Sequence, residues 1–356
     1  MRAETSRVLP AVILGSLLLA TVVVMSLLSP RFLALSNILS ALSLAAPLGI
    51  IAIGMTVVIL IGGIDLSVGS ILALSTVSIG VAAQAGLPAW LAAVVGLAVG
   101  AGCGLVNGLL VSRLGLPSIV VTIATMAVFA GLALAVSGGS SLPAPAEFTF
   151  LGFGRIAGIP MPLVVWLLVF VVALIAISGT RYGEHIYALG TNPRALRYAG
   201  LHDRRLTASA FVLSGLLSGL AGLVFMATVS SAKSNFGQGY ELAVVTIVVV
   251  GGAALTGGAG TLWGTLLATA VIALIRNGLS IAFVPSEVQT LVTGAALIVT
   301  AVLYQWAPAL VAQLRGRRDV PPPAVTESVT VTDPGSEPAH PPAASRRHTT
   351  KKETMQ

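Results

Sequence analysis

The stretch GMTVVILIGGIDLSVGSILAL, residues 54–74, decides the fold of this chain. An apolar run ends at Gly62 and Gly63, a lone acid follows at Asp65, and a second apolar run begins directly after it. A carboxylate costs about 2.5–3.5 kcal/mol at the centre of a membrane helix, so an acid between two such runs marks a break. The stretch therefore predicts two membrane helices separated by a polar break, with Asp65 capping a second helix that begins at Leu66.

The composition extends this prediction to the whole chain. Of the 356 residues, 56% are hydrophobic and 9% charged, against roughly 25% charged in soluble domains. Long unbroken apolar runs exclude a β-barrel, whose strands alternate apolar and polar residues. The sequence predicts an all-α polytopic membrane protein of about ten transmembrane helices, near residues 8–28, 38–61, 66–85, 89–111, 117–136, 162–178, 208–229, 242–257, 260–282 and 286–306.

Positive charge gathers on one side of these predicted spans. The net charge is +7, but only three of the 19 cations are Lys, and an excess of Arg in cytoplasmic loops explains the balance better than nucleic acid binding does. With ten spans both termini lie in the cytoplasm, together with Arg2, Arg7, Arg113, Arg181, Arg194, Arg197, Arg204, Arg205, Arg315, Arg317 and Arg318. Arg276 falls near the end of a span, where it either snorkels or lines a polar path.

The chain divides into four parts by composition. Residues 1–7 form a cytoplasmic N-terminus and residues 8–306 the transmembrane domain, which contains a cytoplasmic loop at 179–207. Residues 316–356 form a Pro-rich basic tail that is predicted to be disordered. The sequence has no Gly-Lys pair for a phosphate-binding loop, and its four His residues and single Cys lack metal-ligand spacing. We predict no catalytic, metal or cofactor site, so the chain is not an enzyme.

Spacing of glycines suggests an internal repeat. Gly62-Gly63-Ile-Asp-Leu-Ser-Val-Gly69 matches Gly251-Gly252-Ala-Ala-Leu-Thr-Gly-Gly258. A weaker second match pairs Asn107-Gly108 with Asn277-Gly278, but it lies 38 residues after the first glycine segment and 19 after the second. Either the span count is wrong there or part of the likeness is coincidence.

Polar residues in or directly beside the predicted spans are candidates for a substrate path. They are Asp65, Ser67, Asn107, Glu241 and Asn277. A broken membrane helix directs its N-terminal amides and polar side chains toward such a path. The alternative for Asp65 is a capping role alone.

Glycines recur every fourth residue along one face of the fourth predicted span, at Gly96, Gly100, Gly104 and Gly108. Such a face lets another backbone approach closely. Its partner is either another helix of the same subunit or a second copy of the chain.

The cytoplasmic loop contains a short helix with clear ends. Asn192 suits the N-cap, Pro193 the first helical position, and Gly200 the left-handed residue that ends the helix. About two turns are too few to be stable alone. The helix therefore either docks on a partner or anchors the loop at the lipid surface.

Five segments together resemble the permease subunits of ribose-type ATP-binding cassette (ABC) sugar importers. They are GMTVVILIGGIDLSVGSILAL (54–74), LGLPSIVVTIATM (114–126), GEHIYALGTNPRALRYAGL (183–201), GYELAVVTIVVVGGAALTGGAGTLWGTLLA (239–268) and IRNGLS (275–280). The resemblance covers residues 8–306. One departure is Ala243 after Tyr240-Glu241-Leu242, where ribose-type members commonly have an acid, which leaves a different substrate open.

The resemblance implies partners and a site. Asn192, Pro193, Arg194, Leu196, Arg197 and Gly200 would form the coupling helix that sits in a groove of an ABC ATPase, and ATP and Mg²⁺ would bind that subunit. A periplasmic or lipid-anchored sugar-binding protein and a second permease, identical or sister, would complete a transporter of the bacterial inner membrane. Import of a sugar-like signalling molecule or a polyol remains open. A shortage of intramembrane acids disfavours an ion-coupled secondary transporter.

Overall fold

A computed structural model describes residues 14–16, 18–27, 29, 31–285, 287–289, 291, 292, 294, 295, 298 and 302. These residues belong to one compact unit, Met1–Val311. The predicted N-terminus at 1–7, the tail at 316–356 and most of the last predicted span, 286–306, lie outside the described residues.

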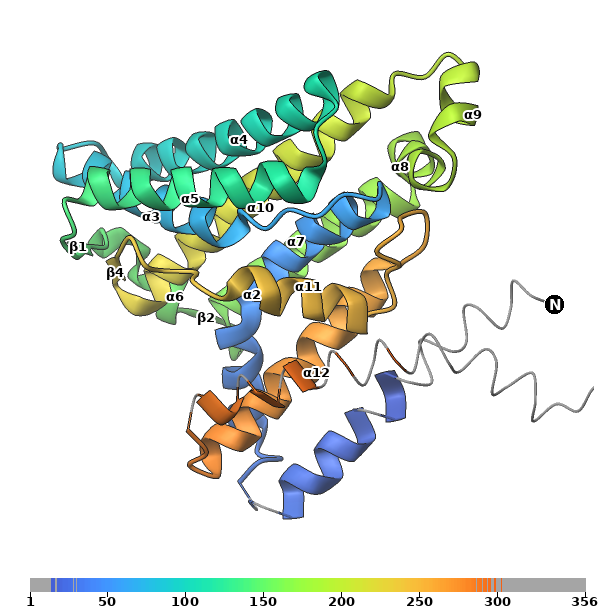
Figure 1. Ribbon diagram of the computed structural model, residues 1–356. Helices are drawn as coiled ribbons and strands as arrows, with labels where there is room; N and C mark the ends of the chain where they lie inside the picture. The colour runs from blue at the N-terminus through green and yellow to red at the C-terminus, as the bar shows by residue number, and fades with distance from the viewer. Residues whose placement is uncertain are drawn as a thin grey trace, which may run out of the picture. The chain divides into compact units, whose positions relative to one another are not determined.

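Among the described residues, six helices are long and apolar enough to cross a membrane, and Figure 1 shows how they are arranged. They are α2 (Leu35–Leu60), α4 (Ala89–Leu114), α5 (Ser118–Ser137), α7 (Met161–Ser178), α10 (Asp203–Val229) and α12 (Leu262–Ile281). Three apolar helices are shorter: Leu14–Leu27, α3 (Val68–Gln84) and α11 (Tyr240–Val250). The protein is thus a polytopic helical membrane protein. The length and composition of the described helices do not confirm the predicted count of ten spans.

Helix α2 is the centre of this unit. Every residue of α2 from Ala45 to Leu60 is buried, and the helix contacts α10, α12, α7 and α11. Its sequence is almost entirely apolar, which is typical of a helix surrounded by protein on all sides. Gly49 makes room for the indole of Trp166 on α7.

Several predicted helix boundaries differ from the structure; the start of α10, for example, lies at Asp203 and not near 208. The predicted span 242–257 ends at Val250, because the chain turns at Gly251 and Gly252. The helix expected to begin at Leu66 begins at Val68, and Ser67 is its N-cap. Asp65 still contributes, since its Oδ1 accepts the backbone N–H of Ser67 at 3.1 Å.

Helices α2 and α11 end in the same hydrogen-bonded turn, the Schellman motif, with a glycine in the left-handed region. The glycines are Gly62 (φ 81°) and Gly252 (φ 88°). The paired bonds run from Gly62 to Ile59 and Gly63 to Val58 in α2, and from Gly252 to Val249 and Ala253 to Val248 in α11. The local repeat is therefore real, but Gly62 matches Gly252, one residue away from the alignment that the sequence suggested.

The second predicted match, of Asn107 with Asn277, is not structurally equivalent. After the first break the chain forms all of α3 before it reaches α4, which carries Asn107. After the second break it enters α12 directly, and Asn277 lies on that helix. One additional helix accounts for the unequal spacing.

Short elements fill the segment between α5 and α7. Strand β1 (Leu142–Pro143) pairs antiparallel with β4 (Ser231–Ala232), and β2 (Arg155–Ile156) pairs with β3 (Ile159–Pro160). Between β1 and β2 along the chain lie the 3-10 turn η1 (Ala146–Phe148) and the helix α6 (Thr149–Phe153). Helix α6 packs on α10, where Gly152 faces the backbone of Ala227.

Candidate functional site

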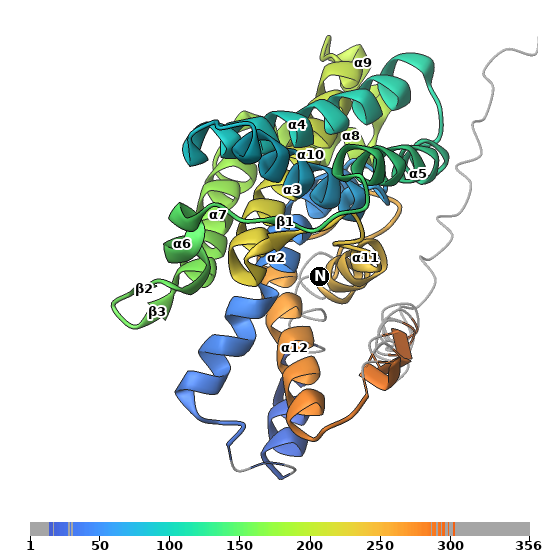
Figure 2. The ribbon, with the colours of Figure 1, turned by 90° about the vertical axis from the view of Figure 1, so that its left-hand side faces the viewer.

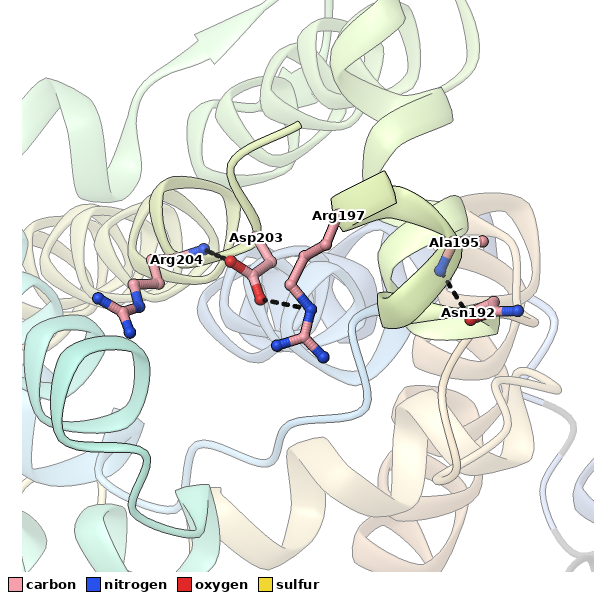
Figure 3. A network of polar contacts seen from close by, with 5 residues as sticks. All are labelled: Asn192, Ala195, Arg197, Asp203 and Arg204. Carbon is pink, nitrogen blue, oxygen red and sulfur yellow. Dashed lines mark hydrogen bonds and ion pairs between the residues drawn. The ribbon is translucent and has the colours of Figure 1, made fainter. Parts of the chain in front are cut away.

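Two helices form the loop between α7 and α10: α8 (Arg181–Thr191) and α9 (Pro193–Tyr198). The predicted short helix is confirmed, since the Asn192 side chain accepts the N–H of Ala195 at 3.0 Å and Pro193 is its first residue (Figure 3). Gly200 has φ 78°, and the N–H groups of Gly200 and Leu201 close the helix end. Both ends of α9 are therefore fixed by local hydrogen bonds.

One side chain of α9 faces the protein and the others face outward. Leu196 is 4% exposed, whereas Arg194, Arg197 and Tyr198 are exposed. Arg197 forms an ion pair with Asp203 at the start of α10, 3.6 Å apart, as Figure 3 shows. Leu196 and Arg197 thus attach α9 to the protein, and Arg194 and Tyr198 (92% exposed) are left for another contact.

The end of α8 lies where the breaks after α2 and α11 meet. We call Gly62, Gly190, Gly257 and Gly258 the glycine junction. The N–H of Gly258 donates to the carbonyl of Leu60 at 2.8 Å. A methyl group added at Gly190 would collide with the Leu60 carbonyl, and one at Gly257 would press on the backbone of Gly62. Three chain segments therefore touch through their backbones, and Gly190 lies three residues before α9 begins at Pro193.

A side-chain bond reinforces this contact. The hydroxyl of Tyr187 on α8 donates to the carbonyl oxygen of Gly260 at 2.8 Å. A tyrosine hydroxyl is protonated at neutral pH, and burial raises the pKa of the Tyr187 hydroxyl further. Helix α8 is thus bonded to the segment that leads into α12.

Asp65 lies in a closed polar cluster at the break between α2 and α3. Its side chain is fully buried. Oδ1 accepts from the N–H and hydroxyl of Ser67, and Oδ2 accepts from the hydroxyl of Ser214 on α10 at 2.9 Å. The Asn107 amide on α4 donates to Ser67 Oγ at 2.8 Å.

Helix α5 binds the same break. Its Ser118 hydroxyl accepts the N–H of Ile64 at 3.1 Å, and its Thr122 hydroxyl donates to the Ile64 carbonyl. The cluster thus ties α4, α5 and α10 to the break, although the buried Oδ1 of Asn107 accepts no hydrogen bond from the described residues. Three of the predicted path residues, Asp65, Ser67 and Asn107, are brought together by it.

A separate cavity of about 280 Å³ lies between α2, α11 and α12, which Figure 2 shows side by side. Its apolar wall comes mainly from α2, and its polar groups come from Tyr240, Thr269, Arg276, Asn277, Ser280 and Gln289. Asp65, Ser67 and Asn107 do not line it. Arg276 also lines this cavity. Of the two alternatives from the sequence, snorkelling or lining a polar path, this position agrees with the second.

The other two predicted path residues lie apart from the Asp65 cluster. Asn277 exchanges two side-chain hydrogen bonds with Asn37 at the start of α2, at 2.9 and 3.1 Å, and also lines the cavity. Glu241 turns toward α3, where its carboxylate lies against Gly69 and accepts the N–H of Gly239. The five predicted residues therefore fall into three places.

The glycine face of α4 is covered within the subunit. Gly100 and Gly104 lie against the backbone of α10 near Gly215 and Phe211, Gly108 against Ala208, and Gly96 against Ile79 of α3. Of the two partners that the sequence allows, the structure places another helix of the same chain on this face.

Several of these contacts have no signal in the sequence. Ser214 belongs to a Gly- and Ser-rich run that does not indicate its bond to Asp65, and the glycine junction depends on backbone atoms. In the described part of the chain, no group of three or more His, Cys, Asp or Glu residues could hold a metal ion.

Residues 37–301 match the family model described as the permease component of the branched-chain amino acid transport system. The chain belongs to this family of transport-system permeases. It is 38% identical to a ribose import permease protein of Bacillus subtilis over 79% of this chain and 88% of that protein. It is 36% identical to the ribose import permease protein of Escherichia coli K12, over 80% of this chain and 90% of that protein.

A third relative is named for a different substrate. The autoinducer 2 import system permease protein of Klebsiella pneumoniae is 35% identical over 80% of this chain and 88% of its own length. No solved structure matches the chain. The family resemblance that the sequence suggested is thus confirmed, and its relatives are permeases of import systems.

Proposed function

We propose that this chain is the transmembrane subunit of an ABC importer that moves a sugar delivered by an extracytoplasmic binding protein. The observation that carries the proposal is α9, a helix with fixed ends and an exposed face, which begins three residues after Gly190 of the glycine junction. Membership of the family supports the permease role, and the ribose import relatives support a sugar as the substrate class.

The proposed mechanism follows from these contacts. A separate ATPase would bind Arg194 and Tyr198, and its closure on ATP and Mg²⁺ would displace α9. Because Gly190 touches Leu60 and Gly258 at backbone distance, such a displacement reaches both broken helices without passing through flexible side chains. A cavity of about 310 Å³ beside Pro193, bordered by Gly62 and Asp203, leaves α9 room to move.

The remaining parts of the transporter are proposed on the same basis. In a bacterial membrane protein of ten spans, α8, α9 and both termini would lie in the cytoplasm. The end of the protein that carries α8 and α9 is rich in arginine, which favours the cytoplasmic side. These residues are Arg113, Arg181, Arg194, Arg197, Arg204 and Arg205. A second permease, identical or sister, and a periplasmic or lipid-anchored binding protein would complete the assembly. ATP and Mg²⁺ would bind the ATPase and not this chain.

A second candidate cargo is a sugar-like signalling molecule. The 35% identical autoinducer 2 permease supports it. Both candidates are small hydroxyl-rich molecules, so the proposed mechanism is the same for each.

The test is ATP-dependent uptake by the complete transporter in proteoliposomes. We expect labelled ligand to accumulate only with ATP on the ATPase side and with the binding protein present. An ATPase variant that binds but does not hydrolyse ATP is the control. Uptake driven by an ion gradient without ATP would instead identify a secondary transporter and overturn the proposal.

A further inference from the structure

A cavity of about 350 Å³ lies where α4 ends and α10 begins, and we call it the arginine cavity. One of its arginines belongs to the last turn of α4 and two belong to the first turn of α10. It is distinct from the 310 Å³ cavity beside Pro193, although Arg204 borders both. The polar residues among its described lining are Ser112, Arg113, His202, Asp203, Arg204 and Arg205.

Close packing of α4 on α10 holds these arginines around one cavity. A methyl group added at Gly108 would collide with the backbone of Ala208, so the two helices touch through their backbones at this point. Gly108 lies within two turns of Arg113, and Ala208 lies one turn after Arg204. The arginine-bearing ends of both helices therefore stay side by side.

The lining of the cavity has an excess of positive charge. Three guanidinium groups face one carboxylate, that of Asp203. The carboxylate is already engaged, because its Oδ2 lies 3.6 Å from Nε of Arg197 and its Oδ1 accepts the backbone N–H of Arg204 at 2.8 Å. Figure 3 shows the guanidinium of Arg204 directed away from Asp203. The cavity thus presents cations together with the Ser112 hydroxyl.

Helix stability does not account for this arrangement. Cations in the first turn of a helix are disfavoured by the helix dipole, and Arg204 and Arg205 occupy that turn of α10. A preference for arginine on the cytoplasmic side explains how many arginines this end has, but it does not gather three of them around one cavity. Arg113, Arg204 and Arg205 are also exposed, so a ligand can reach them.

From this arrangement we propose that the arginine cavity binds an anionic phosphate group, carried by a phospholipid headgroup or by a soluble organic phosphate. A guanidinium binds phosphate through two parallel hydrogen bonds, and the Ser112 hydroxyl can donate another. Basic pockets between membrane helices suit anionic headgroups. The volume of about 350 Å³ falls at the lower end of the roughly 300–1,000 Å³ of ligand pockets, which fits a phosphate with a glycerol-sized group. The proposal is independent of the cargo and of the proposed function.

The test measures binding to the full chain in nanodiscs, without transport. In phosphatidylcholine nanodiscs, calorimetry follows titration with glycerol 3-phosphate, and glycerol is the neutral control. In nanodiscs with equal amounts of phosphatidylglycerol and phosphatidylcholine, native mass spectrometry counts the lipids that stay bound. We expect a preference of at least about tenfold for the anionic member of one pair, on the scale of hydrogen bonds between charged groups. The two arms distinguish the soluble source from the lipid.

Variants connect the preference to the cavity. Arg113→Gln with Arg205→Gln should remove it, whereas Arg155→Gln with Arg181→Gln is the matched control, which loses the same two charges outside the cavity and should behave as wild type. All four side chains are exposed, so the melting temperature should hardly change.

Chemical protection of the wild-type protein tests the site without substitutions. Phenylglyoxal modifies accessible arginines, and the modified peptides are identified by mass spectrometry. The preferred phosphate ligand should slow modification of Arg113 and Arg205 at least about tenfold, on the same energetic scale, and should leave Arg181 unprotected.

Three outcomes would overturn the inference. The first is equal binding of the anionic and uncharged members in both arms. The second is an equal loss of binding in the two double variants, which would show a general effect of charge. The third is modification of Arg113 and Arg205 at an unchanged rate in the presence of the ligand. ATP-dependent uptake of a sugar by the same protein would leave the proposed function standing in each case.

Discussion

The backbone N–H of Gly258 donates a 2.8 Å hydrogen bond to the carbonyl oxygen of Leu60. Leu60 is the last residue of α2, and the last carbonyls of a helix have no partner within it. Here the segment between α11 and α12 supplies one. The end of α2 is thus bonded directly to the segment that follows the repeated glycine turn of α11, next to Gly190 near the end of α8.

Gly190→Ala is expected to disturb this junction. The added methyl group would collide with the Leu60 carbonyl oxygen and crowd Gly258, at a cost of about 1–3 kcal/mol, typical of an overpacked site. We expect a lower melting temperature of the purified protein and a larger loss of uptake than of ATPase binding. Gly131→Ala on α5, where nothing lies within 4 Å, is the control. Wild-type uptake by Gly190→Ala would refute a transmitting role for the junction.

Arg194→Asp and Tyr198→Ala test the exposed face of α9. Because both side chains are exposed, substitution should change stability by less than about 0.5 kcal/mol. If the face docks on the ATPase, copurification of that subunit should fall at least about tenfold, as for residues at the centre of an interface.

Leu196→Ala separates docking from anchoring. Leu196 is buried, so its truncation should lower the stability of the permease by about 2 kcal/mol even without the ATPase. Undiminished copurification in Arg194→Asp and Tyr198→Ala together would show that α9 is not the docking helix.

Local features of this fold could be predicted, and distant ones could not. Asn192, Pro193 and Gly200 determine the ends of α9 through bonds within a few residues, and the sequence displays each of them. The bond between Asp65 and Ser214 joins residues 149 positions apart, and serine is common in helices for other reasons. The contacts of Gly190 use backbone atoms, for which no side chain gives a signal.

The same difference explains the misplaced boundaries. Gly62 and Gly63 follow α2 as Gly251 and Gly252 follow α11, so spacing aligned the first members of each pair. The left-handed residue is the first of one pair and the second of the other. Hydrogen bonds to the preceding helical turn determine which glycine of each pair is left-handed. The sequence alone does not show these bonds.

Asp65→Ala is expected to destabilise the protein by about 2–4 kcal/mol, because Ser214 Oγ and the Ser67 N–H would lose their buried acceptor. Asp65→Asn keeps an oxygen for Ser67 and offers an amide to the Ser214 hydroxyl, so it should lie much closer to wild type. Thermal unfolding in detergent and uptake per folded transporter are the measurements. A loss of uptake in Asp65→Asn at an unchanged melting temperature would mean that Asp65 contacts the ligand and is more than a cap.

Gly104→Ala and Gly102→Ala form a matched pair on α4. At Gly104 a methyl group would collide with the Phe211 carbonyl oxygen of α10, whereas at Gly102 it would meet nothing within 4 Å. We expect Gly104→Ala to lose about 1–3 kcal/mol of stability by forcing the helices apart, and Gly102→Ala to gain up to about 1 kcal/mol from the better helix propensity of Ala. Unfolding curves of the two variants measure the difference. Since α10 covers the glycine face, association between permease copies, measured by light scattering on folded protein, should not change in Gly104→Ala. Dissociation of such a dimer at an unchanged melting temperature would instead show that the face joins two copies.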